Sequence, residues 1–298
     1  SQDILECMQK VKLDSISVLV NMTCSGECID MLVDAVPTLP FLPKMSVHLD
    51  FVEGKCLAGS GEVPLLARKG SDLIGLSWGK LFFLSFYPGK RKAVKKQLKK
   101  EIRAQLAAGW KEIQRCMRAA EACHIPCEQK NLRIDAHQHA HMIPVVWEAL
   151  TEVIEEEHYE VEYIRNSKEI LGAFLSEGTL LKTYRPVNVV KNRLLYLLSR
   201  KVDRYAREHS MKPMYLWGLV MSGYMDYDRI VRLYPAVAGK AAEEHRILEF
   251  CIHPGRMLAE EVTLEVDRQA ADDFYLCSDR QVEKDTVMRL SSLRTKSL

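Results

Sequence analysis

Short apolar segments alternate with longer amphipathic segments along almost the whole chain, and this alternation limits the fold more than any other feature. The short segments are rich in Val, Ile, Leu and aromatic residues, which is typical of strands. They lie within residues 15–21, 45–51, 132–135, 160–164, 214–220 and 246–252. Strands that are separated by helices usually pair in parallel β-α-β units. The sequence therefore predicts an α/β fold, either a sheet or a barrel.

Helices are predicted in the segments between these strands. Residues 91–120 are the clearest case, because apolar residues recur there at the spacing of one helix face. Further helices are predicted at residues 24–36, from Pro144 onward, and at 187–209, 225–237 and 279–292. No internal repeat or low-complexity linker divides the 298 residues, and a chain of this length can bury a large core without disulfides. We therefore predict one α/β domain over residues 1–298, with a C-terminal helix at about 279–292.

The balance of charge and polarity excludes several classes of partner. The net charge of +2 predicts neither a nucleic-acid binder nor a binder of acidic surfaces. The one dense charge run, residues 90–100, has no interleaved aromatic residues, so it is predicted to be the solvated face of a helix. No apolar run is long enough to cross a bilayer, and the first residues do not resemble a signal peptide. Nine cysteines without a recognisable framework are predicted to be reduced. A cytoplasmic protein without a membrane partner is expected.

The strongest chemical signal is the segment RIDAHQHAHMIP, residues 133–144. If the strand continues in extended form, Asp135, His137, His139 and His141 project to one side of it. Imidazole is a common ligand of divalent metals, and α/β proteins place their sites where a strand meets the following helix. The segment therefore predicts a functional site, most simply a metal site.

Two further segments end strands with chemically useful residues. In MSVHLDFVEGK, His48 and Asp50 share one face of a mostly apolar strand. Taken alone, His48 is more simply a hydrogen-bonded histidine of the core. In EFCIHPG, His253 stands at a strand end, where it is either a general acid or base or a structural residue.

These segments together resemble the YdjC-like carbohydrate deacetylase family. HLDFVEGK is similar to the family's His-Leu-Asn-Leu-Thr-Glu-Gly, IDAHQHAHMIP to its Asp-Ser-His-Gln-His-Val-His, and EFCIHPG to its Cys-His-Pro-Gly segment. The order agrees, and the resemblance extends over about residues 1–257. It implies a (β/α) barrel-like fold related to polysaccharide deacetylases. It also implies removal of N-acetyl groups from amino-sugar oligosaccharides such as chitobiose.

The resemblance assigns roles to individual residues. It implies a divalent metal, magnesium or zinc, which an aspartate and two histidines bind, and His48 and His137 match those histidines. His139 and His141 would shape the pocket or orient the ligands, and His253 matches the family's C-terminal histidine. Arg165 resembles a family arginine, although the proline that normally follows two residues later is absent. A homodimer is compatible with the same resemblance.

The family's first strand ends in Asp-Asp-Phe-Gly, and Ser1-Gln2-Asp3 aligns just after that motif. Three explanations stay open. The sequence starts late relative to the family, or the chain is an inactive homologue, or another carboxylate, Asp50 or Asp135, takes the place of the missing pair.

The sequence therefore predicts metal-assisted amide hydrolysis. A carboxylate, for which Asp135 is the candidate, would accept a proton from water, and His253 would protonate the leaving amine. The rival hypotheses are a non-catalytic sugar-binding protein on the same fold and a different metal-dependent hydrolase.

Overall fold

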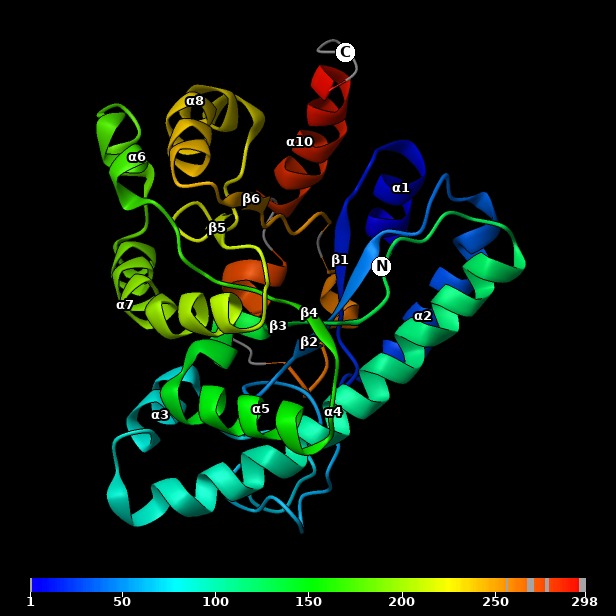
Figure 1. The fold of residues 1–298 in the computed structure, drawn as a ribbon, viewed down its shortest axis with the longest axis vertical. Coiled ribbons are helices and arrows are strands. Elements are labelled where there is room, and N and C mark those ends of the chain that lie inside the picture. The colour runs from blue at the N-terminus through cyan, green and yellow to red at the C-terminus, as the bar shows by residue number, and fades with distance from the viewer. Residues whose placement is uncertain (1, 256, 267–270, 277–278, 295–298) are drawn as a thin grey trace. The chain divides into compact units, whose positions relative to one another are not determined.

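The computed structural model describes residues 2–255, 257–266, 271–276 and 279–294. Its helices are α1 (Gln2–Lys10), α2 (Ser25–Ala35), α3 (Trp78–Leu84), α4 (Pro88–Ala122), α5 (Pro144–Glu156), α6 (Leu171–Ser176), α7 (Pro186–Glu208), α8 (Tyr227–Glu243) and α10 (Asp279–Arg294). Its strands are β1 (Ser15–Val18), β2 (Lys44–Leu49), β3 (Leu132–Ala136), β4 (Val161–Ile164), β5 (Met214–Trp217) and β6 (Ile247–Phe250) (Figure 1). The prediction of an α/β fold is confirmed.

The chain forms two units, each with its own parallel sheet. The four-stranded unit comprises residues 13–164 and 262–268, and the two-stranded unit comprises residues 1–12, 165–261 and 269–298. The order of strands is β1-β2-β3-β4 in the first unit and β5-β6 in the second. A single functional domain stays a prediction.

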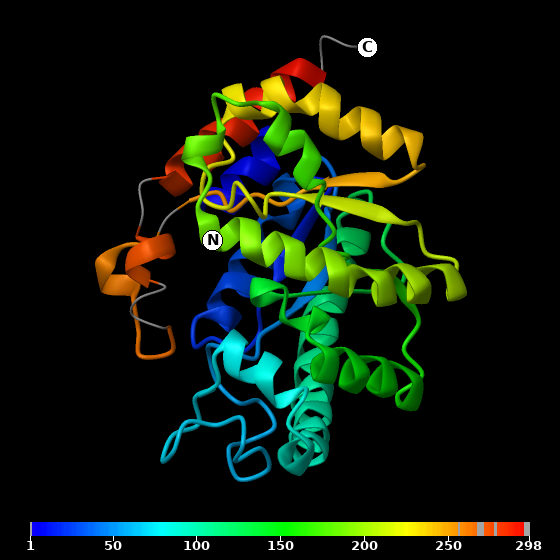
Figure 2. The same ribbon diagram turned by 90° about the vertical axis from the view of Figure 1, so that its left-hand side faces the viewer.

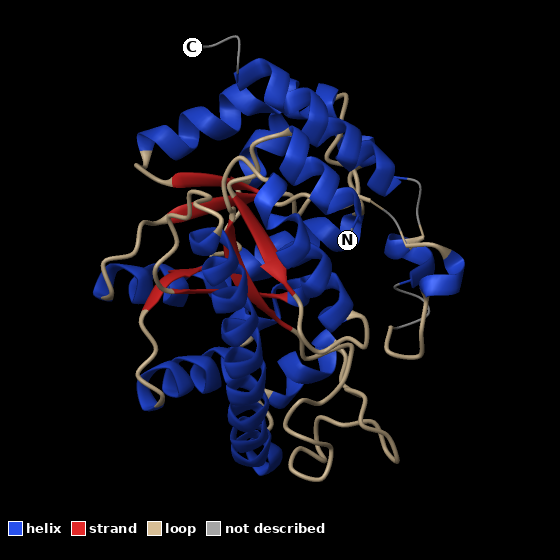
Figure 3. Cartoon of the chain, turned by 90° about the vertical axis from the view of Figure 1, so that its right-hand side faces the viewer, coloured by secondary structure: helices blue, strands red, loops and turns tan. Residues whose placement is uncertain are grey.

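The core of the four-stranded unit lies between its central strands and α4. In β2, Met45, Val47 and Leu49 are fully buried, and α4 buries its own apolar face, which carries Leu98, Ile102 and Leu106. Gly109 lets the helix approach the sheet, because a Cβ atom at this position would lie 2.7 Å from Val47. Figure 3 shows this long helix against the red strands. This packing fixes the strand ends that carry the candidate site.

Part of the charge run in α4 has an unexpected role. Arg91, Lys95 and Lys99 form ion pairs with Glu148, Glu152 and Glu156 of α5. These residues follow one another at helical spacing, so they form a ladder of charge pairs between two neighbouring helices. The predicted solvated face is therefore restricted to the other residues of the run, such as Lys90 and Lys92.

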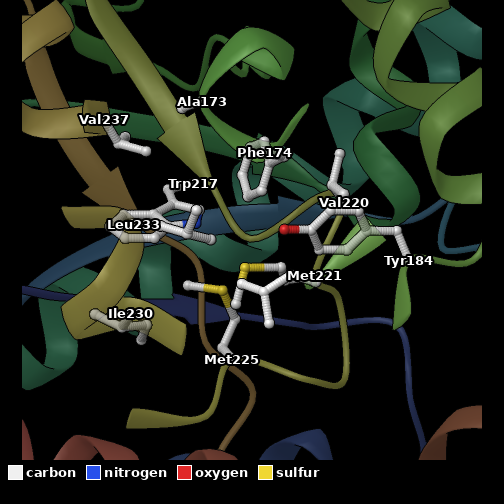
Figure 4. Packing of buried hydrophobic residues seen from close by; sticks show 11 residues of the cluster. Ala173, Phe174, Tyr184, Trp217, Val220, Met221, Met225, Ile230, Leu233 and Val237 are labelled. Carbon is white, nitrogen blue, oxygen red and sulfur yellow. The ribbon is translucent and has the colours of Figure 1, made fainter. Parts of the chain in front are cut away.

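The core of the two-stranded unit is aromatic and sulfur-rich. Phe174, Tyr184 and Trp217 pack with Met221 and Met225 in a buried cluster that residues of α8 complete (Figure 4). The segment that follows β5 is held by a carboxylate. Glu169 accepts hydrogen bonds from the backbone N–H groups of Gly218, Leu219 and Val220 and from the amide of Asn192.

Candidate metal centre

The carboxyl ends of β2 and β3 bring most of the predicted site residues together. The strands are parallel, and His48 pairs in register with Asp135. Carboxyl ends of neighbouring parallel strands meet at one edge of a sheet, which is where open α/β folds bind ligands. His48, Asp50, Asp135 and His137 therefore lie within one part of the four-stranded unit.

The prediction that β3 continues in extended form through its histidines is wrong. The strand ends at Ala136, and residues His137–Met142 form a tight 3-10 turn. Within it, Gln138 and His139 adopt left-handed backbone conformations with φ of 49° and 60°. Such conformations are strained for residues other than glycine and concentrate at functional sites. Because of the turn, His139 and His141 do not continue the alternating row, and His141 is buried while His139 is partly exposed.

Asp135 orients His48. Its Oδ1 lies 2.7 Å from Nδ1 of His48, and its Oδ2 accepts a hydrogen bond of 2.6 Å from the hydroxyl of Ser17 on β1. The side chain of Asp135 is fully buried. Since Nδ1 of His48 faces this carboxylate, Nε2 is the nitrogen that remains as a ligand, an arrangement typical of metal-binding histidines. The ring of His48 stands edge to face with that of His137, at 5.9 Å between centroids.

Asp50, Glu53 and His137 form a cluster that fits a metal ion. One ligand atom from each lies within 4.8 Å of the other two, and Nε2 of His137 is 3.8 Å from Oε2 of Glu53. Oδ1 of Asp50 accepts hydrogen bonds from the N–H groups of Val52 and Glu53, whereas its buried Oδ2 has no hydrogen-bond partner among the described residues. Two carboxylates and an imidazole suit magnesium, manganese or zinc.

The raised pKa of Asp50 is consistent with a metal-binding site. Burial raises the pKa of its carboxyl to about 6, although the N–H groups of Val52 and Glu53 and the nearby His48 act in the opposite direction. A buried carboxylate with one unbonded oxygen is unfavourable in itself. A cation beside that oxygen would remove the penalty.

The loop that carries these carboxylates is fixed from three sides. Gln105 of α4 accepts a hydrogen bond from the N–H of Asp50 and donates one to its carbonyl. Gly54 has a φ of 77°, and a Cβ atom there would lie 2.4 Å from the amide of Asn21, which donates to the carbonyl of Glu53. The N–H of Gly54 donates to the carbonyl of Glu265. The site is thus held by rigid elements.

Sequence reasoning did not assign Glu53, Ser17 or Gln105 to the site. Glu53 was visible as an acid three residues after Asp50, in the turn that Gly54 permits. Gln105 was visible as a polar residue within the apolar face of α4. Ser17 offered no signal, because its partner is 118 positions away in the chain.

The two remaining predicted residues belong to the two-stranded unit, and each has a carboxylate partner there. Arg165 forms a salt bridge with Glu249, at 2.7 Å. The backbone N–H of His253 donates to Glu283, whose Oε2 also lies 3.6 Å from Nδ1 of the ring. Burial lowers the pKa of His253, but the Cys251 thiol and Glu283 outweigh it and raise this pKa to about 9.

This parallel α/β protein has a candidate metal centre at the carboxyl ends of its strands, where such folds bind ligands. The family model described as YdjC-like protein matches residues 130–292, which is more than half of the chain, and the chain therefore belongs to the YdjC-like family. This match indicates a carbohydrate deacetylase-type hydrolase. No curated protein matches the chain. Among the described residues, no helix is long and apolar enough to cross a membrane.

Proposed function

We propose that the protein is a metal-dependent hydrolase that removes N-acetyl groups from amino-sugar oligosaccharides of the chitobiose type. The observation that carries the proposal is the cluster of Asp50, Glu53 and His137, with the unbonded buried oxygen of Asp50. Membership of the YdjC-like family supports the class of substrate.

Asp50, Glu53 and His137 would hold a divalent cation, magnesium or zinc, with Nε2 of His48 as a further ligand. The cation would polarise the acetyl carbonyl and lower the pKa of water. In this arrangement Asp50 and Glu53 supply the carboxylates of the site.

Asp135 has a different role from the one expected of it. Because both of its oxygens accept hydrogen bonds, from His48 and Ser17, it positions His48 instead of accepting a proton from water. Glu53 would have two roles: one of its oxygens binds the cation, and the other is the proton acceptor that we propose. His253 keeps the role of proton donor to the leaving amine that the family resemblance implies.

The further features of this proposal come from the family resemblance. We propose a (β/α) barrel-like fold, one functional domain, a homodimer and a cytoplasmic location. His139, His141 and Arg165 keep the pocket roles that the resemblance implies. The reaction proposed at Asp50, Glu53 and His137 does not depend on these features.

Acetate release from diacetylchitobiose by the metal-depleted protein, with and without added Mg²⁺, Zn²⁺ or Mn²⁺, tests the proposal. Wild type should require an added metal, and His137→Ala should lose about 1,000-fold in activity. His124→Asn is the matched control, since His124 is exposed, lies outside the cluster and has a positive φ that Asn tolerates. Full activity of His137→Ala would contradict the proposal. Binding of the sugar without acetate release under any metal would favour a non-catalytic sugar-binding protein.

A further inference from the structure

Helix α3 and the turn after it present an exposed aromatic surface. Phe83 and Phe86 are each 63% exposed and Tyr87 is 45% exposed. Together with Trp78 and Phe82 they form what we call the aromatic ridge, residues 78–87 of the four-stranded unit. Large apolar residues that are exposed together mark interaction surfaces. Figure 2 shows the loops of residues 51–77, in blue to cyan, leading into this helix.

The ridge is rigid because its rings pack on one another. Trp78 stacks on Phe82 at 5.4 Å, Phe82 meets Phe86 edge to face at 5.2 Å, and Phe83 stacks on Tyr87 at 5.9 Å. Below the rings, the hydroxyl of Ser85 accepts a hydrogen bond from the N–H of Val145 at the start of α5. The ridge is thus a fixed surface feature of this unit.

Unpaired cations flank the ridge. Lys80 lies on α3, and Lys90 and Lys92 lie at the start of α4; all three are exposed. Within the described part of the chain they have no ion pair, whereas Arg91 and Lys95 beside them pair with acids of α5. The surface therefore combines exposed aromatic rings with uncompensated positive charge.

We propose that the aromatic ridge and its three lysines dock the protein on the surface of an anionic lipid bilayer. Aromatic rings bury at the boundary between headgroups and acyl chains, and lysines bind the anionic headgroups. A membrane partner was not expected from the sequence, because no segment can span a bilayer and the net charge of +2 did not favour a binder of acidic surfaces. A local group of exposed rings and lysines that lies on the surface needs neither a spanning segment nor a large net charge.

Charge and ring geometry favour this partner over others. A two-fold contact between copies through the ridge would bring this positively charged surface of one copy against the same surface of the other, and like charges at an interface are unfavourable. Bases and sugars are recognised by stacking on free ring faces. The stacked pairs Trp78–Phe82 and Phe83–Tyr87 cover one face of each of these four rings, which leaves fewer free faces for such stacking.

Co-sedimentation with vesicles of phosphatidylcholine containing 30% phosphatidylserine, and with pure phosphatidylcholine, tests the proposal. The protein should bind the anionic vesicles, and binding should weaken as salt rises from 0.1 to 0.5 M. Each of Lys80→Gln, Lys90→Gln and Lys92→Gln should weaken binding about fivefold. Phe83→Ser/Phe86→Ser should weaken it at least about tenfold. The control is Val190→Ser/Leu197→Ser, since these residues of α7 are 69% and 60% exposed but lie outside the ridge.

Several outcomes would overturn the proposal: no binding to anionic vesicles, equal binding to pure phosphatidylcholine, or equal losses in the α7 control. A dimer in sedimentation velocity that Phe83→Ser/Phe86→Ser dissociates, without vesicle binding, would assign the ridge to a second copy. Loss of binding to chitin oligomers in the same variant, again without vesicle binding, would assign it to sugar. Acetate release from soluble diacetylchitobiose should not change in any ridge variant, so this test and that of the hydrolase activity fail independently.

Discussion

Two buried carboxylates, one in each unit, differ in what surrounds them. Glu169 of the two-stranded unit uses both oxygens, which accept three backbone N–H groups and the amide of Asn192. Asp50 of the four-stranded unit satisfies only Oδ1, and its buried Oδ2 has no hydrogen-bond partner in the part of the chain that the structure describes. The first carboxylate is complete as it stands, and the second lies beside Glu53 and His137 as a ligand would.

The pKa values do not separate these two carboxylates. Burial raises the pKa of both, although hydrogen bonds to each act in the opposite direction. A raised pKa therefore reports burial in both units, and only the inventory of hydrogen bonds distinguishes a structural acid from a ligand. The following predictions test that distinction, in order of decreasing effect.

Asp50→Asn should lower metal-dependent acetate release about 1,000-fold, because the variant loses an anionic ligand. In the metal-free protein the same change should lower the free energy of unfolding by less than about 1 kcal/mol, or raise it, because it removes an uncompensated buried charge. Activity assays and urea denaturation of one preparation check both parts. A variant that unfolds easily would show that Asp50 is a structural acid like Glu169.

Glu169→Gln should lower the free energy of unfolding by about 3 kcal/mol. A glutamine would turn an NH₂ group towards backbone N–H groups, so that a buried donor faces a donor. The affinity of the remaining folded protein for Mn²⁺ should not change. Urea denaturation measures the free energy of unfolding, and titration with Mn²⁺ measures the metal affinity. If Glu169→Gln loses the metal site but keeps normal stability, Glu169 is the ligand and the assignment of the two carboxylates is reversed.

The stability of the metal-free protein should depend on pH through Asp50. Its folded pKa of about 6 lies above its ordinary value of 3.8, so the folded state binds the proton more tightly than the unfolded state. The contribution of Asp50 to the free energy of unfolding therefore rises as the pH falls from 7 towards 4, by on the order of 2 kcal/mol. The difference between wild type and Asp50→Asn in thermal or urea unfolding isolates this contribution. A saturating divalent metal should remove the trend, and a flat difference without metal would contradict the environment described for Asp50.

Asp135 lies between these two cases, because both of its oxygens accept hydrogen bonds, but from the side chains of His48 and Ser17 and not from the backbone. Asp135→Asn should weaken metal affinity about tenfold, because His48 loses the partner that orients it. Ser17→Ala removes only the second hydrogen bond and should have a smaller effect. A loss in Asp135→Asn as large as in Asp50→Asn would indicate that Asp135 binds the metal directly.

The positions of the strands were predictable because apolar runs and their spacing follow local rules. All six predicted strands are present, and His48 and Asp135 lie where their strand ends predict. The turn after Ala136 was not predictable, since Gln138 and His139 adopt conformations that favour glycine. The roles of Glu53 and Gln105 depend on the contact between α4 and the loop after β2, and a contact between distant segments leaves no local pattern in a single sequence.

Binding of Mn²⁺, followed by the electron paramagnetic resonance of the free ion, tests the central claim most directly. Mn²⁺ suits oxygen and imidazole ligands and has little affinity for the cysteines. Wild type should bind one ion per chain, and both His137→Ala and Asp50→Asn should lose that site while Glu169→Gln keeps it. Retention of the site in His137→Ala and Asp50→Asn would show that the cluster at the ends of β2 and β3 is not a metal centre.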